Sequence, residues 1–346
     1  MGAKVGKTDL STRFEILSPE DCDPRWDAYV ASHPQGTIFH TCGMLRAYAT
    51  APKHEVLAMA AVGDDHSIQA IVPAVKVSTL SGIGSHISSR SIWYAEPICE
   101  PTEQGRAALD QLTQLHDRRA RSCLFTEIRN IAAAQHERPV LEDRGYQYKD
   151  YLNYVVDTSD SVENLFSRVS KSTRNKIRRT EKRGVAIELD NSHAAIERMY
   201  RMVRESYARS EVPLADETLF HAALDELPEN VQVRVALHES DVIAGGISLV
   251  YGERFYAWYG GSLRQNGLSP FDLLTWDEIK WSAKNGLRYY DFGGAGWPDE
   301  EYGPREFKKK FGGDLVDYGR YRRIPSPLKL KLAESAYQIA RSVISR

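Results

Sequence analysis

The chain has 346 residues, of which 42% are hydrophobic and 27% are charged, and its formal net charge is -2. A chain of this length can bury two separate cores, and this composition is typical of a soluble globular protein. The near-neutral charge excludes a globally basic nucleic-acid binder, so we expect no DNA partner, and any polyanion must meet a local basic patch.

Several other protein classes lack their sequence signatures here. The chain has neither a P-loop nor a Rossmann glycine fingerprint, which argues against an ATP-dependent ligase or a dehydrogenase. Its histidines and acidic residues show no metal-ligand spacing, so we expect no metal and no tightly bound cofactor. The four cysteines contain no CxxC pair and indicate reduced thiols. Without a signal-peptide core or a run of about 18 apolar residues, we expect a cytoplasmic protein.

The first half of the chain predicts a mixed sheet flanked by helices. It begins with a short strand, FEIL, and two helical stretches before residue 57. The runs EVLAMAAVGDD and HSIQAIVPAVKV, joined through Gly63-Asp64-Asp65, are typical of a β-hairpin. A helix over 107–119 and a buried strand, CLFTEIR, follow. The alternating aromatic and polar residues of RGYQYKDYLNYVVD then predict a closing pair of strands.

Residues 161–183 combine helical periodicity with many basic side chains, and Gly184 is the expected end of the helix. Three interpretations are open: contact with the phosphates of tRNA or of a sugar nucleotide, contact with an anionic membrane surface, or a solvated helix face. We favour phosphate contact. The basic residues assigned to it are Lys171, Arg174, Lys176, Arg178 and Arg179.

The second half repeats the hairpin pattern with VQVRVALHES and DVIAGGISLVYG, and then reaches residues 258–311. This stretch predicts a strand, a glycine pair, a helix, a second strand, a second glycine pair and a basic loop. Ser269 is the expected N-cap of the helix, Pro270 suits its first position, and Gly286 ends it. Unpaired amide groups at the helix N-terminus favour an anion or a polarised carbonyl in front of Ser269.

Two glycine pairs, Gly260–Gly261 and Gly293–Gly294, fall at the same end of this strand-helix-strand unit. Since glycine has no Cβ, the backbone there can approach a ligand closely, whereas the alternative is a pair of ordinary tight turns. Four glycines flanking one helix favour a ligand-binding site. Tyr259, beside the first pair, would line the acceptor pocket, or would instead be a core aromatic residue.

The two halves resemble each other, because each contains a hairpin, a helix, a strand and a closing segment rich in Tyr and Gly. We therefore predict an α/β (mixed α+β) fold with two tandem domains, 1–157 and 158–325, each a mixed twisted sheet flanked by helices. A final helix over 326–346 is expected to dock on the first domain, and peripheral contact with a membrane is the alternative.

A series of ordered motifs suggests a family. KSTRNKIRRTEKRGV, WYGGS, SPFDLLTWDEIKW, YYDFGGA, EFKKKFGG and YGRY together resemble the FemAB/FemX-like branch of the GNAT superfamily. The motifs lie within residues 166–323, and the first half matches only at the level of pattern. The resemblance implies two tandem GNAT-like domains that move an aminoacyl group from a charged tRNA to an amine of a peptidoglycan precursor. Relatives with this fold are assigned acyl transfer in polysaccharide pathways.

The resemblance also implies site residues. The family's FK motif matches Phe307-Lys308, so Phe307 would contact substrate and Lys308 would be the catalytic-site cation; the alternative for Lys308 is a solvated loop. Arg46, within FHTCGMLRAY, stands near the place of a precursor-binding basic residue, although this segment departs from the family pattern. Asp291, which precedes the second glycine pair, would accept a proton or orient the amine, or would cap a turn.

The donor remains open between aminoacyl-tRNA and acyl-CoA, because the loop RQNGLSP departs from the acetyl-CoA loop of ordinary GNAT enzymes. Arg264 and Ser269, with the basic segment, are assigned to the donor phosphates. We thus expect a cytoplasmic or membrane-peripheral transferase acting on a sugar-nucleotide or lipid-linked envelope precursor. The alternatives are an acyl-CoA-dependent N-acyltransferase of polysaccharide or small-molecule synthesis and a non-catalytic paralogue that binds a glycan precursor.

Overall fold

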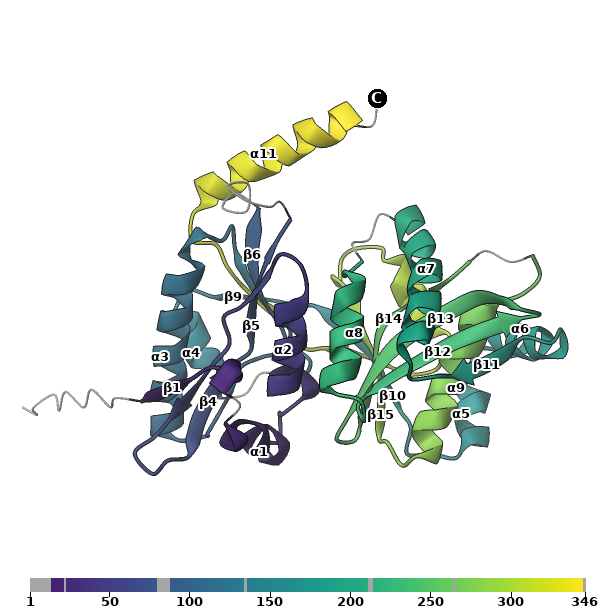
Figure 1. The fold of residues 1–346 in the computed structure, drawn as a ribbon, viewed down its shortest axis with the longest axis horizontal. Helices are drawn as coiled ribbons and strands as arrows, with labels where there is room; N and C mark the ends of the chain where they lie inside the picture. Colours follow the sequence, from purple (N-terminus) through teal and green to yellow (C-terminus); the bar gives the residue numbers. More distant parts are fainter. Residues whose placement is uncertain are drawn as a thin grey trace, which may run out of the picture.

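The computed structural model describes residues 14–21, 23–79, 88–133, 136–210, 214–263 and 266–344. They form two mixed α+β domains that lie side by side (Figure 1). The first domain contains two sheets, of strand order β1-β3-β4-β7 and β2-β5-β6-β8-β17-β9. The second contains one sheet of order β11-β12-β13-β14-β15-β10-β16. The predicted fold class is confirmed.

The elements of the first domain include both predicted hairpin strands and the helix predicted over 107–119, which begins earlier, at Glu103. Its strands are β1 (Glu15–Leu17), β2 (His54–Val56), β3 (Met59–Val62), β4 (Ile68–Val72), β5 (Ala74–Ser78), β6 (Ser89–Trp93), β7 (Ile98–Cys99), β8 (Thr126–Arg129), β9 (Gln147–Lys149) and β17 (Arg320–Arg323). Its helices are α1 (Pro24–Ser32), α2 (Cys42–Thr50), α3 (Glu103–Arg119) and α4 (Arg138–Asp143), with 3-10 turns at Pro19–Asp21, Ile38–His40 and Ala120–Ser122.

The second domain follows the predicted order of helices and strands closely. Its strands are β10 (Leu152–Asp157), β11 (Ala186–Leu189), β12 (Val231–His238), β13 (Asp241–Tyr251), β14 (Arg254–Ser262), β15 (Tyr289–Gly296) and β16 (Asp314–Asp317). Its helices are α5 (Val162–Arg168), α6 (Lys171–Lys182), α7 (His193–Ser210), α8 (Glu217–Glu226), α9 (Pro270–Lys284) and α10 (Gly303–Lys309), and α11 (Pro327–Ile344) ends the chain.

One strand-helix-strand unit occurs in both domains and explains the internal repeat. In the first domain β6 and β8 are parallel and are joined through α3; in the second, β14 and β15 are parallel and are joined through α9. Helix α9 begins at Pro270 and is followed by Gly286, whose φ of +73° suits a glycine after a helix end. Because parallel strands end at the same edge of a sheet, the ends of β14 and β15 lie together.

Three groups of buried side chains form the core. One packs the sheets of the first domain against α3, and another packs the seven-stranded sheet against α5, α6 and α9. The third crosses between the domains, from Trp26 to Met199 and Phe220. There α2 packs on the segment that ends α8, and Gly43 permits the approach, since a Cβ would lie 2.7 Å from Leu227 Cδ2. This shared apolar core fixes how the domains sit on each other.

The two domains exchange their closing strands. Strand β9 stays in the first domain, but β10, which directly follows it in the chain, lies between β15 and β16 of the second. Conversely, β17 directly follows β16 in the chain but lies between β8 and β9 of the first domain. The six-stranded sheet of the first domain and the seven-stranded sheet of the second are therefore each completed by a strand from the other half of the chain.

The two connections that carry the exchange, residues 150–151 and 318–319, are hydrogen-bonded to each other, and we call them the crossing. The Gly319 N–H donates to the Tyr151 carbonyl at 3.2 Å, and the Tyr151 N–H donates to Asp317 Oδ1 at 3.0 Å. Gly319 has a φ of +69°, and a Cβ there would lie 2.2 Å from the ring of Tyr148. The crossing therefore needs glycine at this position.

Two features of the predicted domain limits differ from the structure. The boundary at residue 157 would leave β10 in the first domain, whereas β10 pairs in the second and β17 returns to the first. A strand pattern does not encode its partner strand, because pairing depends on tertiary context.

The final helix, α11, extends away from both domains in Figure 1 instead of docking on the first. Near its start Lys329 Nζ donates to the Ser122 carbonyl of the first domain. The apolar side chains of Leu328 and Leu332 are 70% and 64% exposed, so this part of the stripe packs against neither domain.

Substitution of Gly313 tests the exchange of β10. Gly313 precedes β16, and a Cβ there would lie 2.4 Å from the backbone carbonyl oxygen of Val155 in β10. We expect Gly313→Ala to lower the free energy of unfolding by roughly 2 kcal/mol, because overpacking forces the backbone apart. Gly303→Ala is the control, since a Cβ at Gly303 meets nothing within 4 Å. Urea unfolding followed by circular dichroism measures both, and equal stability of the two variants would contradict the close pairing of β16 with β10.

Candidate functional site

The strands β14 and β15 pair over only part of their length. Their parallel register joins Arg254–Tyr256 to Tyr289–Asp291, and among the described residues no pairing continues beyond it. Strand β15 is irregular at this point: its register with β10 shifts between Asn153 and Val155, and Gly293 has a φ of +70°. We call the gap that opens beyond Tyr256 and Asp291 the fork.

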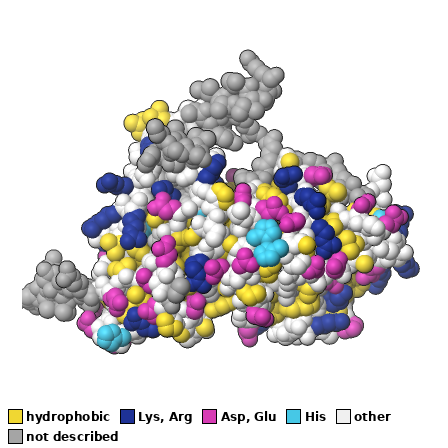
Figure 2. All heavy atoms as spheres, viewed as in Figure 1, with side chains coloured by type: hydrophobic (Ala, Val, Ile, Leu, Met, Phe, Trp, Pro, Cys, Tyr) yellow, Lys and Arg dark blue, Asp and Glu magenta, His cyan; other side chains and the backbone are white. Residues whose placement is uncertain are grey.

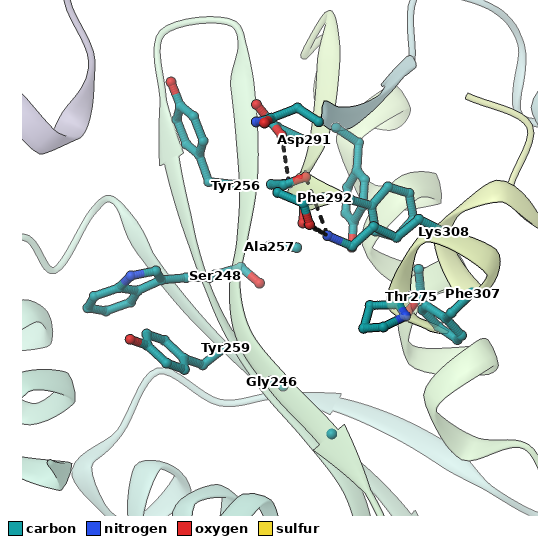
Figure 3. Close-up of a pocket in the computed structure, with 18 of the residues that line it drawn as sticks. Gly246, Ser248, Tyr256, Ala257, Tyr259, Thr275, Asp291, Phe292, Phe307 and Lys308 are labelled. Carbon is teal, nitrogen blue, oxygen red and sulfur yellow. Dashed lines mark hydrogen bonds between the residues drawn. The ribbon is translucent and has the colours of Figure 1, made fainter. Parts of the chain in front are cut away.

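The fork opens into a cavity of about 800 Å³ that lies between the two domains. The second domain supplies most of the wall from β13, β14, β15, α9 and α10 (Figure 3). The first domain supplies Phe39, Tyr94, Arg129, Asn130 and Ile131, and the crossing and its strands supply Tyr151, Asn153 and Arg320. Strand exchange therefore brings residues from both halves of the chain to one cavity.

Lys308 holds the irregular part of β15 from the side of α10 (Figure 3). Its Nζ donates to the carbonyls of Phe292 at 2.7 Å, Gly294 at 2.6 Å and Gly293 at 3.3 Å. Burial lowers the pKa of the Lys308 ammonium to about 8, against the opposing effect of the Asp291 carboxylate. The predicted loop position of Lys308 is wrong, because the residue lies in a short helix, but the predicted approach to the second glycine pair is present.

Asp291 is buried beside Lys308 and is held by two donors. Arg254 Nη1 donates to its Oδ2 at 3.0 Å, and the Gly293 N–H donates to its Oδ1 at 2.7 Å. Burial raises the pKa of the Asp291 carboxyl, and Arg254, the Gly293 N–H and Lys308 act in the opposite direction. Asp291 thus caps the turn in β15, as one of the two sequence-based interpretations expected, and also lines the cavity.

Glu278 is a buried carboxyl group in the cavity wall that the sequence analysis did not select. It lies on α9, and its oxygens accept hydrogen bonds from Ser248 Oγ at 2.8 Å and from the Tyr290 hydroxyl at 2.6 Å. Burial raises the pKa of Glu278, while Arg234 and the two hydroxyl donors lower it. The signal in the sequence is its spacing, since Glu278 lies four residues after buried Leu274 on the face that α9 turns to the sheet.

Most of the substrate-site residues expected from the sequence line the cavity. Gly260 and Gly261 face α9 and α7: a Cβ would lie 3.0 Å from the Phe271 ring at the first and 2.9 Å from Ser206 Oγ at the second. The ring of Phe307 stacks on Phe271 with centroids 5.4 Å apart. The lining residues that were expected are Tyr259, Gly260, Gly261, Asp291, Gly293, Gly294, Phe307 and Lys308.

Other expected residues lie away from the cavity wall. Arg46 forms an ion pair between α2 and α8, with its Nη2 2.8 Å from Glu226 Oε2, because the domains pack on each other there. Ser269 is the N-cap of α9, but its side chain makes no capping hydrogen bond and its N–H donates to Thr180 Oγ1 at 3.0 Å. That amide is thus used within the protein. Arg264 lies outside the described residues.

None of the basic residues of α6 lines the cavity. Arg174 donates to the carbonyls of Ser167 and Val169 at the end of α5, and Arg178 lies over the Phe166 ring at 5.1 Å. Four basic side chains of the helix are exposed, Lys171, Arg178, Arg179 and Lys182, and Arg174 and Lys176 are partly exposed. On the face drawn in Figure 2, basic and acidic side chains are interspersed, in line with the net charge of -2.

None of the helices within the described residues is both long and apolar enough to cross a membrane. Within the same residues there is no group of three or more His, Cys, Asp or Glu side chains that could hold a metal ion. Cys42, Cys99 and Cys123 are buried.

Known proteins share the fold of this chain and part of its sequence. Residues 167–309, which include both strands of the fork and Lys308, match the family model of an acetyltransferase (GNAT) domain. The structure of FemX matches with a TM-score of 0.67 and 16% sequence identity, covering 94% of this chain and 99% of that one. The structure of L-PGS from Bacillus licheniformis matches with a TM-score of 0.58 and 13% identity, covering 94% and 97%. The chain thus shares its fold with both structures.

One curated relative is similar in sequence to part of this chain. The UDP-N-acetylmuramoylpentapeptide-lysine N(6)-alanyltransferase of Weissella viridescens is 27% identical over 150 residues, which span 41% of this chain and 44% of the relative. The match therefore spans less than half the length of that relative. Residues 167–309 thus match a GNAT domain model, and the chain is similar in part of its sequence to this alanyltransferase and in its fold to FemX. The resemblance seen in the sequence motifs is confirmed.

The environment of Lys308 predicts its titration. Because burial lowers its pKa to about 8 while Asp291 raises it, we expect half-maximal deprotonation near pH 8 in the native protein and at lower pH in Asp291→Asn. The measurement is the pH dependence of acetylation by a trace of acetic anhydride, quantified by mass spectrometry, with exposed Lys309 as the internal reference. A Lys308 profile that follows that of Lys309, or that does not change in Asp291→Asn, would contradict the described contacts.

Proposed function

We propose that this protein is an acyltransferase that moves an aminoacyl group from an activated ester onto an amine of a cell-envelope precursor. The observation that carries the proposal is the ammonium group of Lys308 at the fork, where β14 and β15 separate and the cavity between the domains begins. The name of the Weissella relative, an alanyltransferase that acts on a lysine of a peptidoglycan precursor, supports the choice of acyl group and acceptor.

The proposed reaction follows from the charges at the fork. The acceptor nitrogen bonds to the donor carbonyl carbon, the oxygen gains negative charge, and the bond to the leaving oxygen then breaks while the amine loses a proton. A cation fixed near that oxygen stabilises the transition state, and Lys308 would have this role. Asp291 and Glu278 are the buried carboxylates of the wall whose raised pKa values suit acceptance of the proton.

The donor would reach the fork from the side of α6. The end of α6 contacts the start of α9 through Thr180 and Ser269, and α9 supplies Phe271, Thr275 and Glu278 to the cavity wall. The exposed basic side chains of α6 would bind the phosphates of a charged tRNA, leaving its aminoacyl end in the cavity. An acyl-CoA donor is the alternative that the binding experiment below distinguishes.

Removal of the Lys308 charge tests the proposed chemistry. We expect Lys308→Ala to lower the rate of acyl transfer roughly 100-fold or more, as loss of one preorganised oxyanion-stabilising group does in other enzymes. Lys309→Ala, which removes an exposed charge one residue away, should keep the native rate. Transfer is measured with radiolabelled aminoacyl-tRNA and a mixture of envelope precursors, with thermal melting to verify folding. Native turnover in Lys308→Ala would refute the role of Lys308.

Salt dependence tests the assignment of α6 to the donor. For the native protein we expect affinity for a bulk aminoacyl-tRNA pool to fall steeply with salt, and the triple variant Lys171→Gln, Arg179→Gln, Lys182→Gln to lose about 2 units of the log-log slope. The control removes equal charge from the exposed end of the first domain's α3 region: Arg118→Gln, Arg119→Gln, Arg121→Gln. Equal slopes in both triple variants would contradict phosphate contact by α6. Saturable binding of acyl-CoA without tRNA binding would refute the aminoacyl-ester donor.

A further inference from the structure

The first-domain wall of the cavity carries two arginines on neighbouring strands. Arg129 of β8 and Arg320 of β17 are direct partners in the antiparallel register, so both side chains lie on one face of the sheet, and both line the cavity. Like charges directly opposite each other in a sheet are destabilising. A sequence that keeps such a pair at a cavity wall has a reason beyond folding, since local rules are broken mainly at functional sites.

The Glu127 carboxylate accepts hydrogen bonds from both guanidinium groups. Arg129 Nε donates to Glu127 Oε1 at 2.9 Å, and Arg320 Nη1 donates to the same oxygen at 3.0 Å. Burial raises the pKa of Glu127, but Arg129 and Arg320 more than offset this, so its pKa is lowered and the carboxylate is charged. Two cations against one anion leave a positive charge at the wall.

Aromatic rings hold the arginines without using their hydrogen bonds. Arg320 Cζ lies 3.4 Å from the centroid of the Tyr151 ring at the crossing, and Arg129 Cζ lies 5.6 Å from the centroid of Tyr94. The Nε atom of Arg320 is buried and has no hydrogen-bond partner among the described residues. Arg129 makes no hydrogen bond there except through Nε. Guanidinium groups that lie over aromatic rings and keep N–H groups without a protein partner are suited to binding of a carboxylate or phosphate.

We propose that Arg129 and Arg320 form an anion-binding subsite for the acceptor, and that the acceptor carries a carboxylate or phosphate group that this pair binds. The assignment to the acceptor rests on the proposed function, in which the fork of the second domain holds the donor carbonyl. The subsite lies on the first-domain wall, so an acceptor bound there would span the cavity towards Lys308. The arginine pair then selects acceptors by their anionic group.

Arg322 offers a matched control. It lies two residues after Arg320 on the same strand and the same face, stacks on the Phe125 ring at 4.1 Å, and is not part of the cavity wall. The variants are Arg129→Gln, Arg320→Gln and Arg322→Gln, each of which removes one charge and keeps a planar polar group. If Arg129 and Arg320 had only a structural role, replacing either would lower the melting temperature. If they repel each other in the free protein, removing one charge should leave the melting temperature in anion-free buffer unchanged or higher.

The experiment is calorimetric titration of the native protein and the three variants at low ionic strength with inorganic phosphate and, separately, with N-acetylalanine and its amide. We expect an anion to bind the native protein and Arg322→Gln with affinities within twofold of each other. Its affinity should fall about tenfold or more in Arg129→Gln and in Arg320→Gln, as expected for lost hydrogen bonds to a charged group. Binding of phosphate alone identifies a phosphate acceptor group, and binding of N-acetylalanine but not its amide identifies a carboxylate.

The proposal would be overturned if the native protein bound no anion, or if all variants bound it equally. It would also be overturned if Arg129→Gln and Arg320→Gln both lost stability without a change in anion affinity. Binding needs no turnover, so Lys308→Ala should keep the anion affinity of the native protein. If the native protein binds the anion but shows no transfer activity, the subsite is supported and the proposed function is refuted. The subsite and the proposed function can therefore fail separately.

Discussion

The crossing between the two halves of the chain is the constraint on which the rest of the structure depends. Each domain completes one of its sheets, six-stranded in the first and seven-stranded in the second, with a strand that belongs in sequence to the other, and the two connections are hydrogen-bonded to each other through Tyr151 and Gly319. Neither sheet can be removed from the other without losing an internal strand. The cavity depends on this strand exchange, because the exchanged segments bring Tyr151, Asn153 and Arg320 to its wall.

The crossing and the fork are also in direct contact. Gly294 lies against the ring of Tyr151, where a Cβ would approach to 2.8 Å, and the Gly294 carbonyl accepts a hydrogen bond from Lys308. The irregular backbone of β15 is thus held from one side by an aromatic ring of the crossing and from the other by an ammonium group. The same contacts that separate β15 from β14 keep a positive charge at the point of separation. Fold and proposed chemistry depend on one set of interactions.

Local sequence patterns were sufficient for some of these features and insufficient for others. Helix α9 between Ser269 and Gly286 and both hairpins follow from periodicity and turn residues, and the motif around Lys308 pointed to the family, whereas the two glycine pairs lie inside β14 and β15 instead of ending them. The exchange of β10 and β17 has no local signal, because a strand's hydrophobic pattern is the same whichever sheet receives it. Arg129 and Arg320 are separated by most of the second domain in sequence, and Arg46 is drawn into an ion pair by domain packing. Such residues become neighbours only through tertiary structure.

Strand exchange also sets the order in which the molecule can be completed as it is made. The first domain needs β17, whose residues 320–323 are synthesised after all the strands of the second domain, although its other strands end at residue 149. Until then β8 and β9 present unpaired edges, which are prone to associate with other chains. The amino-terminal half therefore cannot complete its fold as soon as it is synthesised. The edges of β8 and β9 must be kept from pairing with other chains until β17 has been made.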